Sequence, residues 1–384
     1  MNVFDYVRWR GDVPLSMDPF NEVDNVVLCV FCYAFIGDCV PADGSEVTVE
    51  EVCDKFFRTH SREEIRKSTS FIAPAPLLMD YMNAGSRFAG LGIRHYVNEV
   101  EADKAEQFSA VTYHLSDGTY FVAFRGTDNT VTGWKECFAL SYLDETEGQR
   151  RAVEYLNMIG EEVDGPIRVG GHSKGGNFAM YSAAFCRPEV QERIIEVWSN
   201  EGPGFGEDVL TSPEYLRVAG RIRRLVTDTS MIGMLFGHGT GYTVVRSSAK
   251  GIVQHDANTW CVDKNRFERA ELSETSRLVG RILGRWLAGT DYETRGSFTE
   301  SIFTLFEAAG KDTVDEILGQ RRDSAKAALA ALRGLPNEKR QELRRLIRRF
   351  VWISRHERHK TYVRRIQGKI QDRIQDRQRR RQQS

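Results

Sequence analysis

The feature that most constrains the fold is a short segment where a β-forming run passes directly into a helical one. Ile167–Gly170 has the composition of a short buried strand, and Lys174–Arg187 has that of a helix. The intervening residues are Gly, His and Ser, and two more glycines follow Lys174. Glycine permits the close approach that such a sharp turn requires. The segment therefore predicts a strand–turn–helix unit of an α/β chain.

The neighbouring segments repeat this alternation. Ser109–Leu115 and Thr119–Phe124, joined by a glycine-containing turn, predict a hairpin. Further strands are expected at Ile194–Ser199, Ile222–Thr227 and Thr243–Arg246, with helices between the earlier ones. Strands that alternate with helices favour a mostly parallel central sheet covered on both faces. The fold class is therefore α/β.

Three regions are expected along the chain. Residues 1–264 form the main domain, of which residues 1–100 look mostly helical. Residues 265–334 form a helical extension, and residues 335–384 form a basic tail that begins after the turn-forming Gly-Leu-Pro-Asn.

Ser173 is the predicted nucleophile. Gly171-x-Ser173-x-Gly175 follows a strand and opens a helix, which presents a serine hydroxyl at the carboxyl edge of the sheet. The helix N-terminus adds positive potential beside a developing oxyanion. The alternatives are a structural serine in a glycine-rich turn and a phosphate-binding loop, but the Lys-Ser/Thr ending of a P-loop is missing.

An oxyanion hole is expected from two backbone amides. One is the N–H of Lys174, the residue after the nucleophile. The other is the N–H of Thr127, in the polar turn that ends the strand Thr119–Phe124, where Gly126 permits close approach. An ordinary strand-end turn is the alternative interpretation.

These motifs together resemble the class-3-lipase-like α/β hydrolases, and within them a bacterial subgroup of mostly uncharacterised members. The resemblance covers about residues 1–310. It rests on Phe-Arg-Gly-Thr at 124–127 with Trp134, on Gly-His-Ser-Lys-Gly-Gly-Asn at 171–177, and on Gln-His-Asp at 254–256. It implies an α/β-hydrolase fold with a helical C-terminal extension. Two positions depart from the subgroup, which tends to have aspartate where this chain has Cys137 and Glu201.

A base must take the proton of Ser173, and in this fold a histidine downstream of the serine does so. His255 follows the last predicted strand and matches the Gln-His-Asp of the subgroup, so it is the predicted base. His238 is the alternative, although its glycine-bounded position fits a mobile loop better. His172, beside the serine, is expected to point away.

Two carboxylates remain candidates for the acid that orients the base. Asp228 closes the strand Ile222–Thr227, where this fold commonly carries its acid. Glu201 closes the preceding strand, a position that some lipases use. A helix cap and a turn are the respective structural alternatives, and Asp256 is expected to be structural.

The C-terminal tail is strongly basic. Between Lys339 and Arg381, basic side chains outnumber acidic ones by more than ten, although the whole chain has a formal net charge of −1. Apolar residues recur among them at three-to-four spacing, which predicts a basic amphipathic helix interrupted near Ser354–Lys360. Such a helix suits an anionic membrane surface or a protein partner, with nucleic acid the least favoured partner. Packing on its own domain is the alternative.

The composition also indicates where the protein is located. Seven irregularly spaced cysteines, an N-terminus without an apolar core and the lack of a long apolar run predict a cytoplasmic protein, with the inner membrane surface as a peripheral location. We expect a serine hydrolase of carboxylic esters, such as lipid or lysophospholipid esters, that needs no metal or organic cofactor. The alternatives are a thioesterase or amidase with the same triad, and a catalytically weak scaffold that acts through its tail. The apolar segments Trp134–Leu143 and Met231–Phe236 are expected to form either a cover over the site or part of the core.

Overall fold

An eight-stranded sheet organises the chain, and its strands lie side by side in the order of the sequence. In this computed structural model all residues are described except 68–74, 102–105, 129–130, 308–329, 331 and 383–384. The strands are β1 (Val47–Thr48), β2 (Gly92–Glu101), β3 (Glu106–His114), β4 (Tyr120–Phe124), β5 (Ile167–His172), β6 (Ile194–Asn200), β7 (Ile222–Thr227) and β8 (Thr243–Val245).

The sheet changes direction at β4. Strands β1 to β4 pair antiparallel, whereas β4 to β8 pair parallel. The expectation of an α/β chain with a mostly parallel sheet is confirmed, and the arrangement is compatible with an α/β-hydrolase-like fold. Because β4 to β8 run in one direction, the residues that follow them meet at one edge of the sheet.

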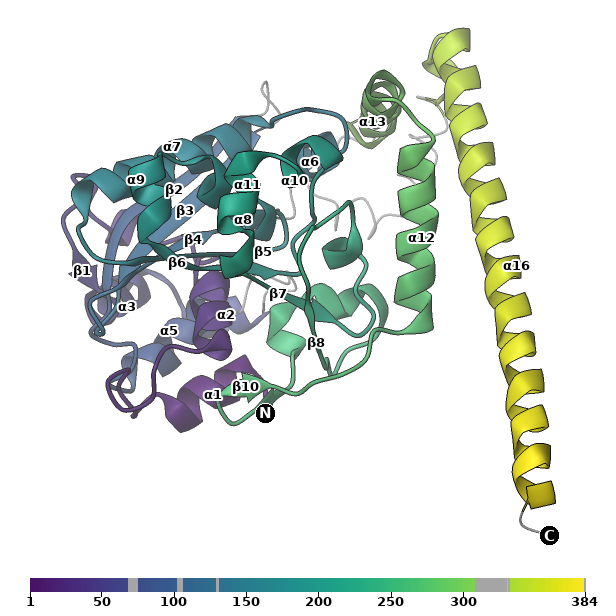
Figure 1. Ribbon diagram of the computed structural model, residues 1–384. Helices are drawn as coiled ribbons and strands as arrows, with labels where there is room; N and C mark the ends of the chain where they lie inside the picture. The colour runs from purple at the N-terminus through teal and green to yellow at the C-terminus, as the bar shows by residue number, and fades with distance from the viewer. Residues whose placement is uncertain (68–74, 102–105, 129–130, 308–329, 331, 383–384) are drawn as a thin grey trace.

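Helices cover both faces of the sheet (Figure 1). On one face an apolar core includes residues of the N-terminal helices, and on the other face a second core includes residues of the helices between β4 and β7. The first group is α1 (Val3–Arg10), α2 (Glu22–Phe31), α3 (Val49–Thr59), α4 (Arg62–Lys67) and α5 (Ala75–Asn83). The second comprises α6 (Val131–Ala139), α7 (Glu147–Glu162), α8 (Lys174–Phe185), α9 (Pro188–Arg193), α10 (Glu207–Leu210) and α11 (Pro213–Val218).

The segment after β8 is irregular before it becomes helical. It holds the short 3-10 helices η5 (Gly251–His255) and η6 (Ala257–Thr259), and a two-stranded hairpin of β9 (Val262–Asp263) and β10 (Arg266–Phe267). The expectation of an all-helical chain from about Asn265 is therefore wrong by a few residues, since the first long helix, α12, begins at Glu274.

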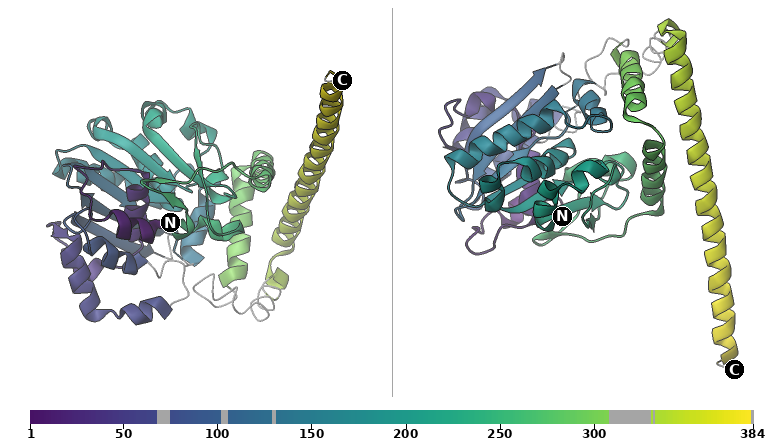
Figure 2. Two further views of the ribbon diagram at one scale, coloured as in Figure 1. Left: turned by 90° about the horizontal axis from the view of Figure 1, so that it is seen from below. Right: turned by 45° about the horizontal axis from the view of Figure 1, so that its top comes forward.

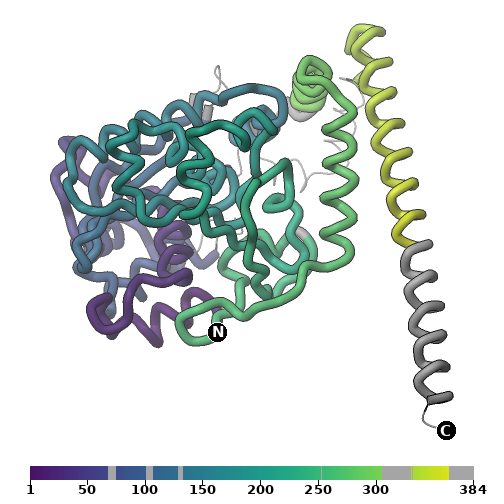
Figure 3. The backbone as a smooth tube through the Cα atoms, in the orientation of Figure 1, coloured from purple at the N-terminus to yellow at the C-terminus, as the bar shows by residue number. Residues whose placement is uncertain are grey.

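Three helices follow β10 in the described part of the chain: α12 (Glu274–Ala288), α13 (Tyr292–Glu307) and α16 (Asn337–Gln382). They lie on one side of the sheet, with α12 between the sheet and α16 (Figures 1 and 2). The tube in Figure 3 shows α16 running past α12 at the outer edge of the molecule.

The expected break of the tail helix near Ser354–Lys360 does not occur, because α16 is continuous through this stretch. The apolar stripe is replaced there by Glu357, which is buried and pairs with Arg281 and Arg285 of α12. Ion pairs from Glu357 to two half-exposed arginines therefore take the place of an apolar contact, which the apolar pattern alone does not reveal.

The expectation of a mostly helical first 100 residues also misses β2. Its register shifts between Arg94 and Val97, and His95 within this bulge has a φ of 51°. The bulge adds a residue to the strand and so interrupts the two-residue alternation of side chains. Ile93 therefore packs in the core on one face of the sheet, and Val97 packs against the core on the other face.

Candidate active site

Ser173 occupies the sharp turn between β5 and α8. Its backbone has φ 58° and ψ −131°, a region that residues other than glycine rarely adopt. A Cβ on Gly171 would lie 2.1 Å from the carbonyl oxygen of Gly175, so the helix folds back onto the strand only because both positions are glycine. The backbone N–H of Ser173 donates to the carbonyl of Asn200 at the end of β6 (2.9 Å). The turn thus holds Ser173 at the carboxyl edge of the sheet.

The loop after β4 lies directly against this serine. A Cβ on Gly126 would come within 2.8 Å of the Ser173 Cβ and 2.4 Å of the carbonyl oxygen of His172. Thr127 follows and is buried. Among the described residues, no acceptor is bonded to the backbone N–H of Thr127 or of Lys174. Both expected oxyanion donors therefore flank Ser173 with their amides available.

His255 and Glu201 form a hydrogen-bonded pair, and the carbonyl of His255 is bonded to His172, the residue before Ser173. Glu201 directly follows β6, is 1% exposed, and its Oε2 lies 3.3 Å from Nδ1 of His255. Its carboxylate also accepts from the backbone N–H groups of Thr227 (2.6 Å) and Gly233 (3.4 Å). Burial is the largest single influence and raises the pKa of Glu201, but the interactions with His255 and the hydrogen bonds from Thr227 and Ser230 together hold that pKa below its usual value. A carboxylate at Nδ1 requires Nδ1–H, which leaves Nε2 as the proton acceptor.

The other candidate residues are placed elsewhere. The half-buried Asp228 follows β7, and its carboxylate accepts from the Thr229 hydroxyl (3.4 Å); among the described residues, no hydrogen bond or ion pair joins it to His255. Asp256 accepts from the backbone and side chain of Asn258 (both 2.9 Å) and so begins η6. His238 lies in the loop before β8, where its carbonyl accepts from the Tyr215 hydroxyl. The structure thus brings Glu201, and not Asp228, to His255.

His172 has a positioning role that the sequence did not indicate. Its Nε2 bonds the carbonyl of His255 (2.7 Å), and its Nδ1 bonds the Tyr33 hydroxyl (3.0 Å). A carbonyl only accepts, so Nε2 carries the proton and Nδ1 accepts from Tyr33. Burial, followed by the nearby charge of His255, lowers the pKa of His172 to about 3. A neutral ring beside the serine therefore holds the backbone of the predicted base.

Besides its backbone amide, Lys174 contributes its side chain to an ion pair. Its ammonium is fully buried and pairs with Glu136 of α6, which is 2% exposed. Glu136 also accepts from the backbone N–H groups of Gln107 (3.2 Å) and Gly148 (3.0 Å). The pair ties the first residue of α8 to the helix after the oxyanion loop.

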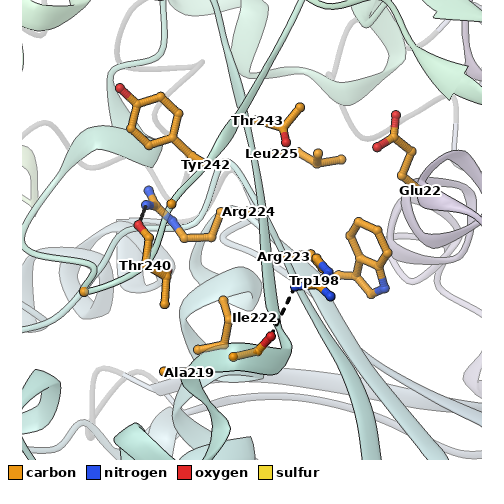
Figure 4. A pocket seen from close by; sticks show the side chains of 13 residues that line it. Glu22, Trp198, Ala219, Ile222, Arg223, Arg224, Leu225, Thr240, Tyr242 and Thr243 are labelled. Carbon is orange, nitrogen blue, oxygen red and sulfur yellow. Dashed lines mark hydrogen bonds between the residues drawn. The ribbon is translucent and has the colours of Figure 1, made fainter.

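Arg224 of β7 fastens the segment that contacts Glu201. It is 3% exposed and donates to the carbonyls of Gly233 (2.8 Å) and Thr240 (3.3 Å), while the N–H of Gly233 bonds Glu201. Figure 4 shows its side chain turned toward Thr240 and Tyr242, in a cavity of about 640 Å³. This cavity lies at the amino ends of β7 and β8, at the other end of the sheet from Ser173.

An apolar cavity of about 240 Å³ adjoins the site. The two segments expected as cover or core, Trp134–Leu143 and Met231–Phe236, supply two of its walls, and α12 supplies the third. Gly233 lies within the second segment and bonds Glu201, so this wall is continuous with the His255–Glu201 pair. The lining residues are Trp134, Cys137, Phe138, Ser141, Met231, Ile232, Leu235, Phe236, Leu283, Trp286 and Leu287.

Neither a metal-binding cluster nor a membrane-spanning helix is found in the described part of the chain. No group of three or more His, Cys, Asp or Glu side chains is arranged there to hold a metal ion. No helix within it combines the length and the apolar character needed to cross a membrane.

Comparisons with known proteins add a family. A model of the Mbeg1-like family matches residues 82–304, more than half of the chain, and this range contains Ser173, Glu201 and His255. Among curated proteins, none is significantly similar in sequence. M37 lipase is 14% identical with a TM-score of 0.34, over 55% of this chain and 68% of that one. The Rhizomucor miehei lipase in its native propeptide complex is 14% identical with a TM-score of 0.32, over 56% of this chain and 80% of that one.

Proposed function

This chain belongs to the Mbeg1-like family, and we propose that it is an α/β-hydrolase that cleaves carboxylic esters through an acyl-enzyme. The observation that carries the proposal is the strained turn at Ser173, held beside the His255–Glu201 pair. Two bonds make this arrangement close: His172 bonds the His255 carbonyl, and the Ser173 N–H bonds Asn200, which precedes Glu201. These bonds support a nucleophile at Ser173, a base at His255 and an orienting acid at Glu201 that act together.

The proposed reaction has two halves. The Ser173 hydroxyl oxygen attacks the ester carbonyl carbon as its proton passes to Nε2 of His255, while the N–H groups of Lys174 and Thr127 hold the oxyanion. Collapse breaks the carbon–oxygen bond to the alcohol, which leaves with the proton from His255. Water then attacks the acyl carbon, giving its proton to His255, and the acid departs as Ser173 regains its proton. Glu201 remains a carboxylate throughout.

The substrate class follows from the apolar cavity. Its lining is almost entirely aliphatic and aromatic, so it suits a hydrocarbon chain better than a polar acyl group. We therefore favour a lipid or lysophospholipid ester whose acyl chain lies between α6, the segment Met231–Phe236 and α12.

A fluorophosphonate probe, which reacts with activated serines, tests the proposal. We expect labelling of the wild type that disappears in Ser173→Ala and persists in Ser248→Ala, since Ser248 is exposed away from the turn. Nitrophenyl esters of graded chain length then report the substrate class, with longer chains preferred. A folded wild type that neither reacts with the probe nor hydrolyses any of these esters would overturn the proposal and favour a scaffold.

A further inference from the structure

Helix α16 packs on the molecule through one face. Leu343, Leu346 and Ile353 are buried along it. Glu357 continues the same face and pairs with arginines of α12, and Glu342 accepts from the Ser297 hydroxyl of α13 (2.9 Å). These contacts fix which side of α16 faces away from the rest of the protein.

The outward face combines basic and aromatic side chains. Val351, Trp352 and Tyr362 are 41%, 59% and 63% exposed, a large exposure for such residues. Arg348 and Arg355 lie between them at three-to-four spacing, so all five share one stripe of the helix. Figure 1 shows that this helix stands at the outer edge of the molecule. Within the described chain, the ring contact of this stripe is to its own helix, where Trp352 stacks on His356 with ring centroids 5.3 Å apart.

The charge of this face is almost entirely of one sign. Residues 337–362 contain nine Lys or Arg and three Glu. Two of these three, Glu342 and Glu357, are engaged on the inward side with α13 and α12. The exposed side therefore presents arginines with little to neutralise them, which is complementary to an anionic surface.

The inward side of the same helix closes a second apolar cavity, of about 270 Å³. This cavity shares three lining residues with the cavity beside the active site, so the two adjoin. The shared residues are Phe138, Leu283 and Trp286, and α16 contributes Leu346, Ile347 and Phe350. Ile347 and Phe350 are themselves half exposed, at 48% and 39%, so apolar surface reaches from the cavities to the edge of the outward face.

We propose that the outward stripe of α16 docks the protein on the surface of an anionic lipid bilayer. Tryptophan and tyrosine among arginines are the side chains that settle at a membrane–water interface, with the rings near the headgroups and the cations on anionic lipid. In this orientation α16 lies between the bilayer and the second cavity, and the half-exposed Ile347 and Phe350 that line this cavity lie at the edge of the docked face. The further step, that an acyl chain enters the site from the bilayer, rests on the proposed function.

Vesicle flotation of the full chain tests the docking. We expect the wild type to float with phosphatidylcholine vesicles that contain phosphatidylglycerol, to stay behind with phosphatidylcholine alone, and to be released by high salt. Arg344→Glu/Arg348→Glu/Arg355→Glu should weaken partition by roughly 100-fold or more, since each basic side chain near an anionic surface contributes about 1 kcal/mol. Trp352→Ala should weaken binding with no change in its salt dependence.

Two controls keep the outcome interpretable. Lys55→Glu/Arg58→Glu/Arg66→Glu changes the net charge equally at exposed positions of α3 and α4, and should float like the wild type. Ser173→Ala should also float normally, so a failure of catalysis is separated from a failure of docking. Equal flotation of the two triple variants would overturn the proposal. Capture of a single-stranded RNA without any binding to anionic vesicles would do the same, in favour of nucleic acid.

Discussion

Replacing Glu201 by glutamine should lower the rate of ester hydrolysis by three to four orders of magnitude. Its Oε2 lies 3.3 Å from Nδ1 of His255 in a buried position. Two unit charges at this distance attract by about 5 kcal/mol at an effective dielectric constant of about 20. In the proposed reaction His255 gains a positive charge as it takes the proton of Ser173, so this attraction grows in the transition state. At about 1.4 kcal/mol for each factor of ten, its loss corresponds to a few thousandfold.

Asp228→Asn is the matched control for this change. It removes one carboxylate charge after the next strand, but the side chain of Asp228 bonds the Thr229 hydroxyl and not the base. Its kcat/KM on a short nitrophenyl ester should stay close to that of the wild type. Thermal unfolding of both variants checks that they fold. A folded Glu201→Gln protein with nearly normal kcat/KM, or a thousandfold loss in Asp228→Asn, would refute the assignment of the acid.

Three further outcomes follow from buried groups near the site. Glu136→Ala should lower the free energy of unfolding in urea by about 3–5 kcal/mol, because it leaves the buried Lys174 ammonium without its partner. Adding Lys174→Met should recover much of this loss. A loss below about 1 kcal/mol in Glu136→Ala would count against a stabilising role for the pair. The pKa of His172 is lowered from 6.5 to about 3, so the unfolded chain takes up a proton there before the folded chain does, and stability should fall as pH drops from 6.5 toward 3. His172→Phe should flatten this slope in pH-dependent urea unfolding, whereas the exposed His359→Asn should not. Leu235→Trp should place a larger side chain in the 240 Å³ cavity and raise KM for long-chain nitrophenyl esters only. An equal rise in KM for nitrophenyl acetate would show that the cavity does not bind the acyl chain.

The sheet from β3 to β8 could be predicted because its sequence signals are local. Each strand is a short β-forming run bounded by turn residues, and the structure places strands at all the expected runs between Ser109 and Arg246. The misses occur where tertiary contacts override the local pattern. The bulge at His95 interrupts the two-residue alternation of side chains in β2, and the buried Glu357 interrupts the apolar stripe of a helix that continues.

The candidate site residues were likewise predictable where the sequence signal is local, and not where distant contacts decide. Ser173 stood out because its turn is encoded by adjacent glycines, and the loop at Thr127 because a strand ends there. The choice between Glu201 and Asp228 was open because both follow strands at the same sheet edge. Only the path of the loop that carries His255 decides which carboxylate it contacts, and that path depends on bonds between residues far apart in the sequence.

Those distant bonds also explain how the turn at Ser173 persists. A non-glycine residue in this backbone region costs about 1–3 kcal/mol, while one hydrogen bond contributes about 1 kcal/mol net, so several independent ties are needed. The structure supplies them from different segments: the carbonyl of Asn200 holds the N–H of Ser173, and His172 is fixed between Tyr33 and the carbonyl of His255. The bonds that hold the strained turn therefore also tie it to the segment of His255 and to the end of β6, which Glu201 follows. A change at Tyr33, far from the chemistry, should therefore disturb the nucleophile and the base together.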